Sequence, residues 1–376
     1  MWPVLLLLLA MAVGAALYFY RFFHRALDTF GVNTKRTGVK VGLGVCAACL
    51  GAVCLDITSL GMLIVLHVLA AAWFVQLIQF VIRKLAAERY REGFRAWKKL
   101  YGSGILPVLA SLILLVFGYL NMHHVVQTDY TVYTDKNIRS EGYRVALIAD
   151  VHFGVSVDEA ELLEICGEIS SQEPDLVVLC GDIIDDATSA EDMEVVFRTL
   201  GTIESAYGSF YVYGNHDRPM AMLESQYTED ALIRAIESSG ITILQDETVF
   251  IGEDLVLAGR EDRGYGQPER LDIDTLLEDV NPEAFIVTLD HQPRDYAACG
   301  RSRTDLLLSG HTHGGQLWPV NVIDSIFKFN DAVYGHTWID EDTQAVVTSG
   351  LAGWGYPIKT AAPAEYVIVH IQRQTY

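Results

Sequence analysis

The chain has 376 residues, of which 51% are hydrophobic, and a formal net charge of −21. Residues 1–124 hold 12 Lys and Arg against 4 Asp and Glu, which leaves 15 of the 27 basic and 44 of the 48 acidic residues to 125–376. Such an acidic second part argues against nucleic acid as its partner, because binding to a polyanion relies on Lys and Arg. The composition therefore predicts a basic membrane region followed by an acidic globular domain.

Four apolar runs predict about four transmembrane helices, at 2–20, 41–55, 60–82 and 105–120. No basic residue precedes the first run, so we expect an uncleaved span rather than a signal peptide. Basic residues gather at 21–40 and 83–101. We expect the protein in the plasma membrane, where the positive-inside rule places both segments on the cytoplasmic side. The amino terminus and the globular domain are then extracytoplasmic. This orientation inverts if 41–55, the weakest run, does not cross.

The segment near 83–101 carries Tyr90, Phe94, Trp97 and Tyr101 at helical spacing among basic residues. This pattern predicts an amphipathic helix on the inner leaflet, with a solvated connector as the alternative. The spans themselves contain almost no charge apart from Asp56, which argues against a transport pathway. Residues 125–142 are expected to be a linker to a domain over 143–376.

Within that domain, apolar strand-like runs end at polar blocks. The runs are 143–149, 175–180, 209–213, 284–289 and 305–308, with a helix-like segment at 157–170 and two further strands, expected to be antiparallel, at 344–348 and 365–371. Open α/β sheets place their sites at the carboxyl ends of buried strands. We expect an α/β four-layer sandwich, in which two packed mixed sheets are flanked by helices.

Five polar blocks close these runs. They are Asp150-Val-His152, Gly181-Asp182-Ile-Ile-Asp185, Gly214-Asn215-His216-Asp217, Asp290-His291 and Gly310-His311-Thr-His313-Gly-Gly-Gln316. Each block alone would be an ordinary surface pair or turn. Together they supply the carboxylate, amide and imidazole groups that divalent cations bind. The sequence therefore predicts a two-metal site that hydrolyses phosphate esters.

The five blocks resemble those of the calcineurin-like metallophosphoesterase superfamily, over roughly 143–371. The string from His311 to Gln316 and the segment 349–359 are similar to a branch of membrane-associated bacterial phosphoesterases, which includes UDP-2,3-diacylglucosamine hydrolase-like and cell-wall-associated proteins. Lys359 stands where that branch more often has Arg, which puts a bidentate contact with substrate there in doubt.

The resemblance implies two divalent metal ions, with Mn²⁺ expected first and Fe²⁺, Zn²⁺ or Co²⁺ also compatible. One ion would be held by Asp150, His152, Asp182 and His313, and the other by Asp182, Asn215, His291 and His311. Asp182 would bridge the two ions. A hydroxide shared by the ions would then attack the phosphorus of a phosphate mono- or diester.

His216 is expected to act on the leaving group as a hydrogen-bond or proton donor, with Asp185 orienting its ring. The membrane region favours a lipid-linked or cell-envelope substrate. A non-catalytic metal-binding sensor or scaffold is the alternative function. Arg260 or Arg263, in the charged segment 260–270, would contact substrate or lie in a solvated loop.

Overall fold

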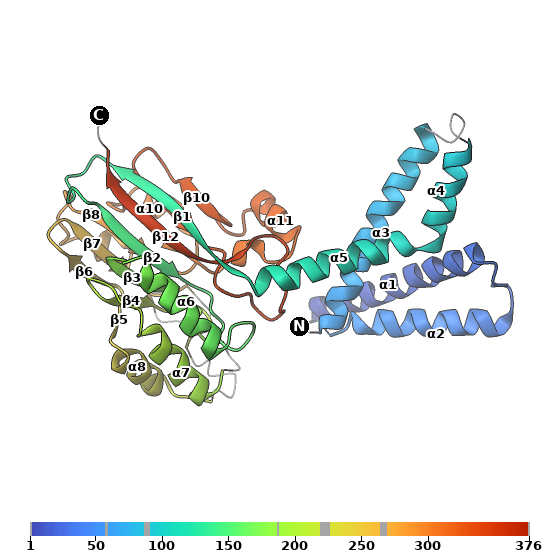
Figure 1. Cartoon of the computed structure of the whole chain (residues 1–376), viewed down its shortest axis with the longest axis horizontal. Helices are drawn as coiled ribbons and strands as arrows, with labels where there is room; N and C mark the ends of the chain where they lie inside the picture. Colours follow the sequence, from blue (N-terminus) through green and yellow to red (C-terminus); the bar gives the residue numbers. More distant parts are fainter. Residues whose placement is uncertain are drawn as a thin grey trace. The chain divides into compact units, whose positions relative to one another are not determined.

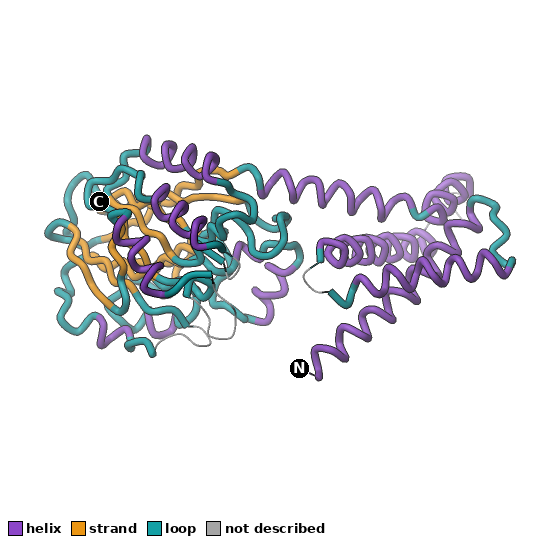
Figure 2. The backbone as a smooth tube through the Cα atoms, turned by 90° about the horizontal axis from the view of Figure 1, so that it is seen from below, coloured by secondary structure: helices purple, strands orange, loops and turns teal. Residues whose placement is uncertain are grey.

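The computed structural model describes residues 2–56, 59–85, 91–185, 188–218, 226–263 and 269–374. The chain divides into two compact units, Met1–Phe117 and Gly118–Tyr376. The described part of the first unit is helical, and the second unit contains all the strands that the structure describes, with its helices outside them (Figures 1 and 2).

The apolar runs of the first unit are helices. They are α1 (Trp2–Thr29), α2 (Thr37–Val53), α3 (Leu60–Leu85), α4 (Arg91–Ser103) and α5 (Ile105–Met122), the last of which ends inside the second unit. Among the described residues α1, α3 and α5 are long and apolar enough to cross a membrane. The predicted count of four is therefore not reached on length, because the 17 residues of α2 extend for about 26 Å against a hydrocarbon core of about 30 Å.

Contacts within the first unit show how its helices run. A Cβ atom on Gly51 would lie 2.5 Å from the Ala12 carbonyl oxygen, so the end of α2 packs on the first half of α1. Arg25 Nη1 donates a 2.6 Å hydrogen bond to the Tyr101 hydroxyl. The carboxyl end of α1 and helix α4 therefore lie at one end of this unit, and α2 runs back along α1. Tyr90, which we expected on the amphipathic face, lies outside the described residues.

Two six-stranded sheets form the second unit. Sheet A has the order β1 (Val125–Thr134), β12 (Ala364–Arg373), β2 (Tyr143–Ile148), β3 (Leu176–Cys180), β4 (Ser209–Val212), β5 (Ile241–Ile243). Sheet B has the order β10 (Gly335–Trp338), β11 (Gln344–Val347), β9 (Leu306–Ser309), β8 (Phe285–Leu289), β7 (Leu255–Gly259), β6 (Glu247–Ile251). Both sheets are mixed, with β2, β3, β4 and β5 mutually parallel, and likewise β7, β8, β9 and β11.

The helices of the second unit lie outside the two sheets. They are α6 (Glu159–Ser171), α7 (Ala190–Leu200), α8 (Glu229–Ser238), α9 (Ile273–Leu276), α10 (Tyr296–Cys299), the short 3₁₀ helix η1 (His313–Gly315) and α11 (Val320–Phe327). Of these, α6 to α10 cover the outer faces of the sheets. Alternating strand residues separate the cores. Leu147 and Val178 pack with sheet B residues such as Val287, whereas Ile148 and Leu179 pack with residues of α6 to α8. Helices α9 and α10 cover the far face of sheet B. The predicted four-layer sandwich is confirmed.

The prediction of a linker at 125–142 is wrong for its first ten residues. These residues form β1, which pairs in parallel with β12 from Val125–Ala364 to Thr134–Arg373. β-branched and aromatic residues favour this extended conformation, and Val132 is fully buried. The strands expected to be antiparallel at 344–348 and 365–371 are β11 and β12. Strand β12 is antiparallel to β2, whereas β11 is parallel to β9.

Candidate metal centre

The predicted ligands all follow the carboxyl ends of central strands. Asp150 and His152 follow β2, Asp182 follows β3 and Asn215 follows β4, whereas His291 follows β8 and the two histidines His311 and His313 follow β9. Because β2, β3 and β4 are parallel neighbours, as are β8 and β9, their ends meet along one edge of the sandwich. Polar blocks that are far apart in the sequence therefore meet at one site.

Two three-residue groups of potential metal ligands result. Asp150, His152 and His313 form one group, and Asp182, His291 and His311 form the other, with the ligand atoms of each group within 4.8 Å of one another. One carboxylate oxygen lies between them, since Asp182 Oδ2 is 3.1 Å from His291 Nε2 and 3.8 Å from His152 Nε2. Asp182 is therefore placed to serve both groups.

The residues fit divalent cations. His152 Nε2 and Asn215 Oδ1 are buried and have no hydrogen-bond partner within the protein, and such atoms destabilise a folded protein unless something satisfies them. His291 Nδ1 is 2.8 Å from the Cys180 carbonyl oxygen, which leaves Nε2 facing Asp182. Imidazole, carboxylate and amide oxygen together form a donor set suited to Mn²⁺, Fe²⁺ or Zn²⁺.

The backbone at these ligands is held in an unusual conformation. Asp150, His152, Asp182, His311 and His313 have φ between 37° and 72°, and they are half of the ten non-glycine residues described with positive φ. Such angles bring Cβ close to the backbone and are uncommon outside glycine, asparagine and aspartate. Strain of this kind gathers where a function fixes the direction of a side chain.

Burial and neighbouring charges set the protonation of the ligands. Burial raises the pKa of Asp150 to about 6 and lowers the pKa of His311 to about 3. Burial opposes ionisation of Asp182 as well, but the imidazole of His291 beside it holds the pKa of this carboxyl below its usual value. A deprotonated Asp182 and a neutral His311 are the forms that bind a metal ion.

His216 and Asp185 lie beside the first group. Asp185 Oδ1 is 3.8 Å from His216 Nδ1, but Asp185 Oδ2 is 3.3 Å from His152 Nδ1. The carboxylate thus lies between the two rings and is closer to the predicted ligand than to the predicted proton donor. The ring of His216 lies 5.5 Å from that of Trp354 and borders the cavity of the site.

Asp217 is a residue of the site whose role the sequence analysis missed. Its buried carboxylate accepts backbone hydrogen bonds from Asp182, Ile183, Ile184 and Gly214, at 2.6–3.2 Å. It therefore ties the loop after β3 to the loop after β4. Its place in the Gly-Asn-His-Asp block was the only available signal, and that block alone is typical of a turn.

Asp290 and the arginines of 260–270 have a structural role. Asp290 is fully buried and pairs with Arg260 at 3.2 Å and with Arg270 at 3.0 Å. Arg260 is itself only 2% exposed, and Arg263 pairs with Asp295. Of the two alternatives for Arg260, a substrate contact and a solvated loop, neither agrees with this buried ion pair. Residues 264–268 lie outside the part of the chain described.

Lys359 also points into the protein. It is fully buried, and its Nζ donates to the carbonyl oxygens of Ser349, Gly350 and Ala352. Burial lowers the pKa of this amine to about 7. The same loop donates from Ala352 N to the Asp150 carbonyl oxygen at 2.9 Å, so Lys359 shapes the backbone around a predicted ligand.

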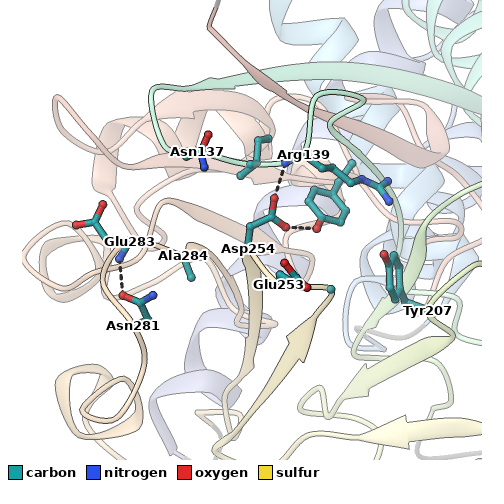
Figure 3. A pocket seen from close by; sticks show the side chains of 11 residues that line it. Asn137, Arg139, Tyr207, Glu253, Asp254, Asn281, Glu283 and Ala284 are labelled. Carbon is teal, nitrogen blue, oxygen red and sulfur yellow. Dashed lines mark hydrogen bonds between the residues drawn. The ribbon is translucent and has the colours of Figure 1, made fainter.

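Two cavities lie at opposite ends of the strands. One of about 430 Å³ is lined by Asp182, Asn215, His216, His311 and His313, and by the apolar side chains of Leu317, Val320 and Trp354. Another of about 680 Å³ lies at the amino ends of β2, β7 and β8, where Asp254 accepts hydrogen bonds from Arg139 N and the Tyr143 hydroxyl (Figure 3). The larger cavity holds none of the predicted ligands, so the chemistry belongs to the smaller.

Comparison with known proteins agrees with this geometry. The family model described as calcineurin-like phosphoesterase matches residues 143–315. Residues 143–315 are a calcineurin-like phosphoesterase domain. The matched range contains every predicted metal ligand together with His216 and Asp185, whereas β1, β12 and Lys359 lie outside it. Domains of this family are metal-dependent phosphoester hydrolases.

Relatives of this chain come from bacteria and animals. An uncharacterized metallophosphoesterase of Campylobacter jejuni is 29% identical over 71% of this chain and 71% of its own length. A "transmembrane protein with metallophosphoesterase domain" of Danio rerio is 29% identical over 69% of this chain, which spans 61% of that relative. A solved dimetal phosphatase, also from Danio rerio, matches 55% of this chain and 87% of its own at 12% identity, with a TM-score of 0.36.

Proposed function

We propose that the protein is a membrane-anchored two-metal phosphoesterase that hydrolyses phosphate mono- or diesters of lipid-linked or cell-envelope molecules. The observation that carries the proposal is the pair of ligand groups joined at Asp182 Oδ2, at the edge of an open cavity. Orphaned ligand atoms on Asn215 and His152 point to the same chemistry.

Asp150, His152, Asp182 and His313 would hold one ion, and Asp182, Asn215, His291 and His311 the other, with Mn²⁺ as the first choice. Bound divalent ions supply a nucleophile from water at neutral pH and neutralise the charge on the phosphoryl oxygens. The protein's own part is to hold these ligands rigidly. The His216 backbone N–H contributes by donating to Asp182 Oδ1 at 2.9 Å.

His216 would hydrogen-bond or protonate the ester oxygen as it leaves. Its side chain borders the cavity and lies against Trp354. Asp185 would favour the tautomer of His216 that presents Nε2 to the substrate, while also orienting His152. A general acid placed in this way typically contributes a rate factor of about 10²–10⁴.

The helical unit supports anchoring by several spans. The end of α1 and helix α4 lie together through Arg25 and Tyr101, and both belong to basic segments that favour the cytoplasm. We propose that helix α2 recrosses the membrane despite its length, since its end packs near Ala12 in the first half of α1, away from Arg25. With four crossings, the phosphoesterase domain would lie outside the cytoplasm.

The alternative, a metal-binding sensor or scaffold, predicts a different response to one substitution. Replacing His216 by Ala removes no predicted ligand. An enzyme would lose most of its turnover while keeping its metal content, whereas a scaffold would lose neither metal nor partner binding.

The test uses the full-length protein in detergent micelles, loaded with Mn²⁺, on a chromogenic phosphomonoester and a chromogenic phosphodiester side by side. Asp182→Asn serves as the blank. We expect hydrolysis of at least one ester by the wild type, its loss in Asp182→Asn, and a rate reduced by about 10²-fold or more in His216→Ala. A folded, metal-loaded wild type that hydrolyses neither these esters nor phosphoesters of a membrane lipid extract would refute the proposal.

A further inference from the structure

Helix α11 exposes its apolar side chains and buries an acid. Asp324 is the one residue of this helix described as buried, at 8% exposed. The apolar surface of α11, defined here as Trp318, Val322, Ile323, Ile326, Phe327 and Phe329, has side chains that are 43–69% exposed. Soluble proteins rarely expose several large apolar side chains side by side. A contiguous apolar patch of this kind is typical of a surface that binds a partner or a membrane.

The orientation of the helix is fixed by its contacts. Asp324 accepts hydrogen bonds from Asn330 N at 3.0 Å and Asn330 Nδ2 at 2.7 Å. At its start, a Cβ atom on Gly315 would lie 2.5 Å from Asn321 Cα, so the helix packs tightly on η1. Asn330 Oδ1 in turn accepts a hydrogen bond from Arg294 Nε at 3.0 Å. Polar residues therefore hold α11 to the domain, and the apolar surface faces outward as part of the fold.

The same unit contains the last turn of the final predicted span. At that turn Asn121 Nδ2 donates to the carbonyl oxygens of Lys359 and Ala362, at 3.0 and 2.8 Å. Thr360, between them, is bonded to the segment before α11, since its N–H donates to Gln316 O at 2.7 Å and its hydroxyl accepts from Trp318 N at 2.9 Å. One short strip of backbone thus joins the end of α5 to the start of the apolar surface.

A span that ends at Met122 leaves the bilayer there. A segment bonded to the same strip lies close to the level of the head groups, where tryptophan and phenylalanine are favoured. Lys328 is the one charged side chain at 326–329, at the carboxyl end of the helix, and the domain as a whole is acidic. Binding to the membrane would therefore come from burial of apolar side chains and not from attraction to anionic lipids.

We propose that the apolar surface of α11 inserts into the bilayer interface and brings phosphoesters carried on lipids to the metal centre. Val320, the first residue of the helix, and Leu317 line the cavity beside His216 and His311. The lipid's phosphoester head group enters this cavity while its chains remain in the membrane along α11. This inference rests on the proposed function and adds to it a class of substrate and a route of entry.

Membrane insertion is tested with a polarity-sensitive fluorophore on Ser325→Cys, in a Cys46→Ser, Cys49→Ser background that removes the two exposed cysteines. The protein is reconstituted in phosphatidylcholine nanodiscs with spin-labelled lipid. The matched control is Ser171→Cys on α6, because both serines are exposed and bonded to the preceding helical turn. We expect a blue shift and lipid quenching at 325 and neither at 171. A label at 325 whose emission matches that of a fluorophore in water overturns the inference. A blue shift without quenching by spin-labelled lipid also overturns it, because a second copy of the protein would shield the label in that way.

The route of entry is tested by rates on two esters, a soluble chromogenic phosphodiester and the same group carried on a dialkyl lipid in the nanodisc. The variant Ile326→Ser, Phe327→Ser should lower the ratio of lipid to soluble rate roughly tenfold or more. Leu163→Ser, Phe250→Ser, which also removes two exposed apolar side chains, should leave the ratio as in the wild type. Equal ratios for both variants overturn the route. A wild type inactive on both esters would contradict the proposed function, while the label still decides the inserted surface.

Discussion

The Asp217 carboxylate accepts a 2.8 Å hydrogen bond from the backbone N–H of Asp182, the residue that joins the two ligand groups. Three further backbone N–H groups from two loops point to the same carboxylate. Its position explains how a strained loop after β3 can hold Asp182 still.

Replacing Asp217 by Ala should therefore lower the free energy of unfolding by about 2–3 kcal/mol or more, because four buried N–H groups lose a charged acceptor. The measurement is thermal unfolding of the full-length protein in detergent. Glu237→Ala, an exposed position on α8, is the control. A midpoint equal to that of the control would mean that the four bonds are replaced.

Asp185→Asn should lower Mn²⁺ affinity by about 10–100-fold, because the carboxylate lies 3.3 Å from His152 Nδ1 and is placed to orient this predicted ligand. Titration of metal-free protein with Mn²⁺ measures this directly. His216→Ala, which alters the other neighbour of Asp185, should leave the affinity near that of the wild type. If instead both variants bind Mn²⁺ normally, Asp185 acts on His216 alone.

Removal of metal should destabilise the protein. At a hundredfold excess of Mn²⁺ over its dissociation constant, binding adds about 2.7 kcal/mol to the free energy of unfolding, so a chelator should lower the unfolding midpoint. Asp182→Asn removes the carboxylate that we expect both ions to share and should show little difference between Mn²⁺ and chelator. An equal shift in this variant would place the stabilising ion elsewhere.

Lys359 predicts a pH dependence of stability. Burial lowers its pKa from 10.5 to about 7 in the folded protein, so between these values the unfolded chain binds the extra proton and stability rises with pH. The contribution is complete above about pH 10.5 and is lost as pH falls through about 7. Lys359→Met should flatten this rise, whereas Lys328→Met, at an exposed lysine, should not. Parallel curves for all three proteins would contradict the assignment.

The membrane orientation can be read from a reporter fused after Tyr376. Four crossings with Arg25 and helix α4 in the cytoplasm predict activity for a reporter that works only outside the cytoplasm. Activity of a cytoplasm-only reporter would overturn the topology, and with it the extracytoplasmic position of the domain.

The sequence predicted the layers, and the structure brings the predicted ligands together, for one physical reason. Apolar runs ending in Asp150, Asp182 or His291 combine a strand signal with polar residues at the strand end, where a parallel sheet assembles sites. β1 was missed because its residues follow the apolar run of α5 directly, with no turn signal between Met122 and Val125 to mark a new element.

Long-range polar contacts could not be predicted in the same way. Asp217 meets Asp182 across 35 positions, and Arg260 meets Asp290 across 30, so neither sequence neighbourhood contains its partner. A charged, glycine-containing stretch such as 260–270 is ordinarily solvated, and only the fold shows that Arg260 is buried in an ion pair.

The positive φ angles at five predicted ligands lower the stability of the fold, while the side chains at these positions are the ones that metal binding would require. Glycine would adopt these angles freely, whereas each Asp or His resists them by about 1 kcal/mol. A library selected only for thermal tolerance in the presence of a chelator should therefore drift toward glycine at positions such as His152 and His313. The most heat-resistant descendants of this chain would then be catalytically dead, and selection for durability would need metal-dependent turnover as a simultaneous requirement.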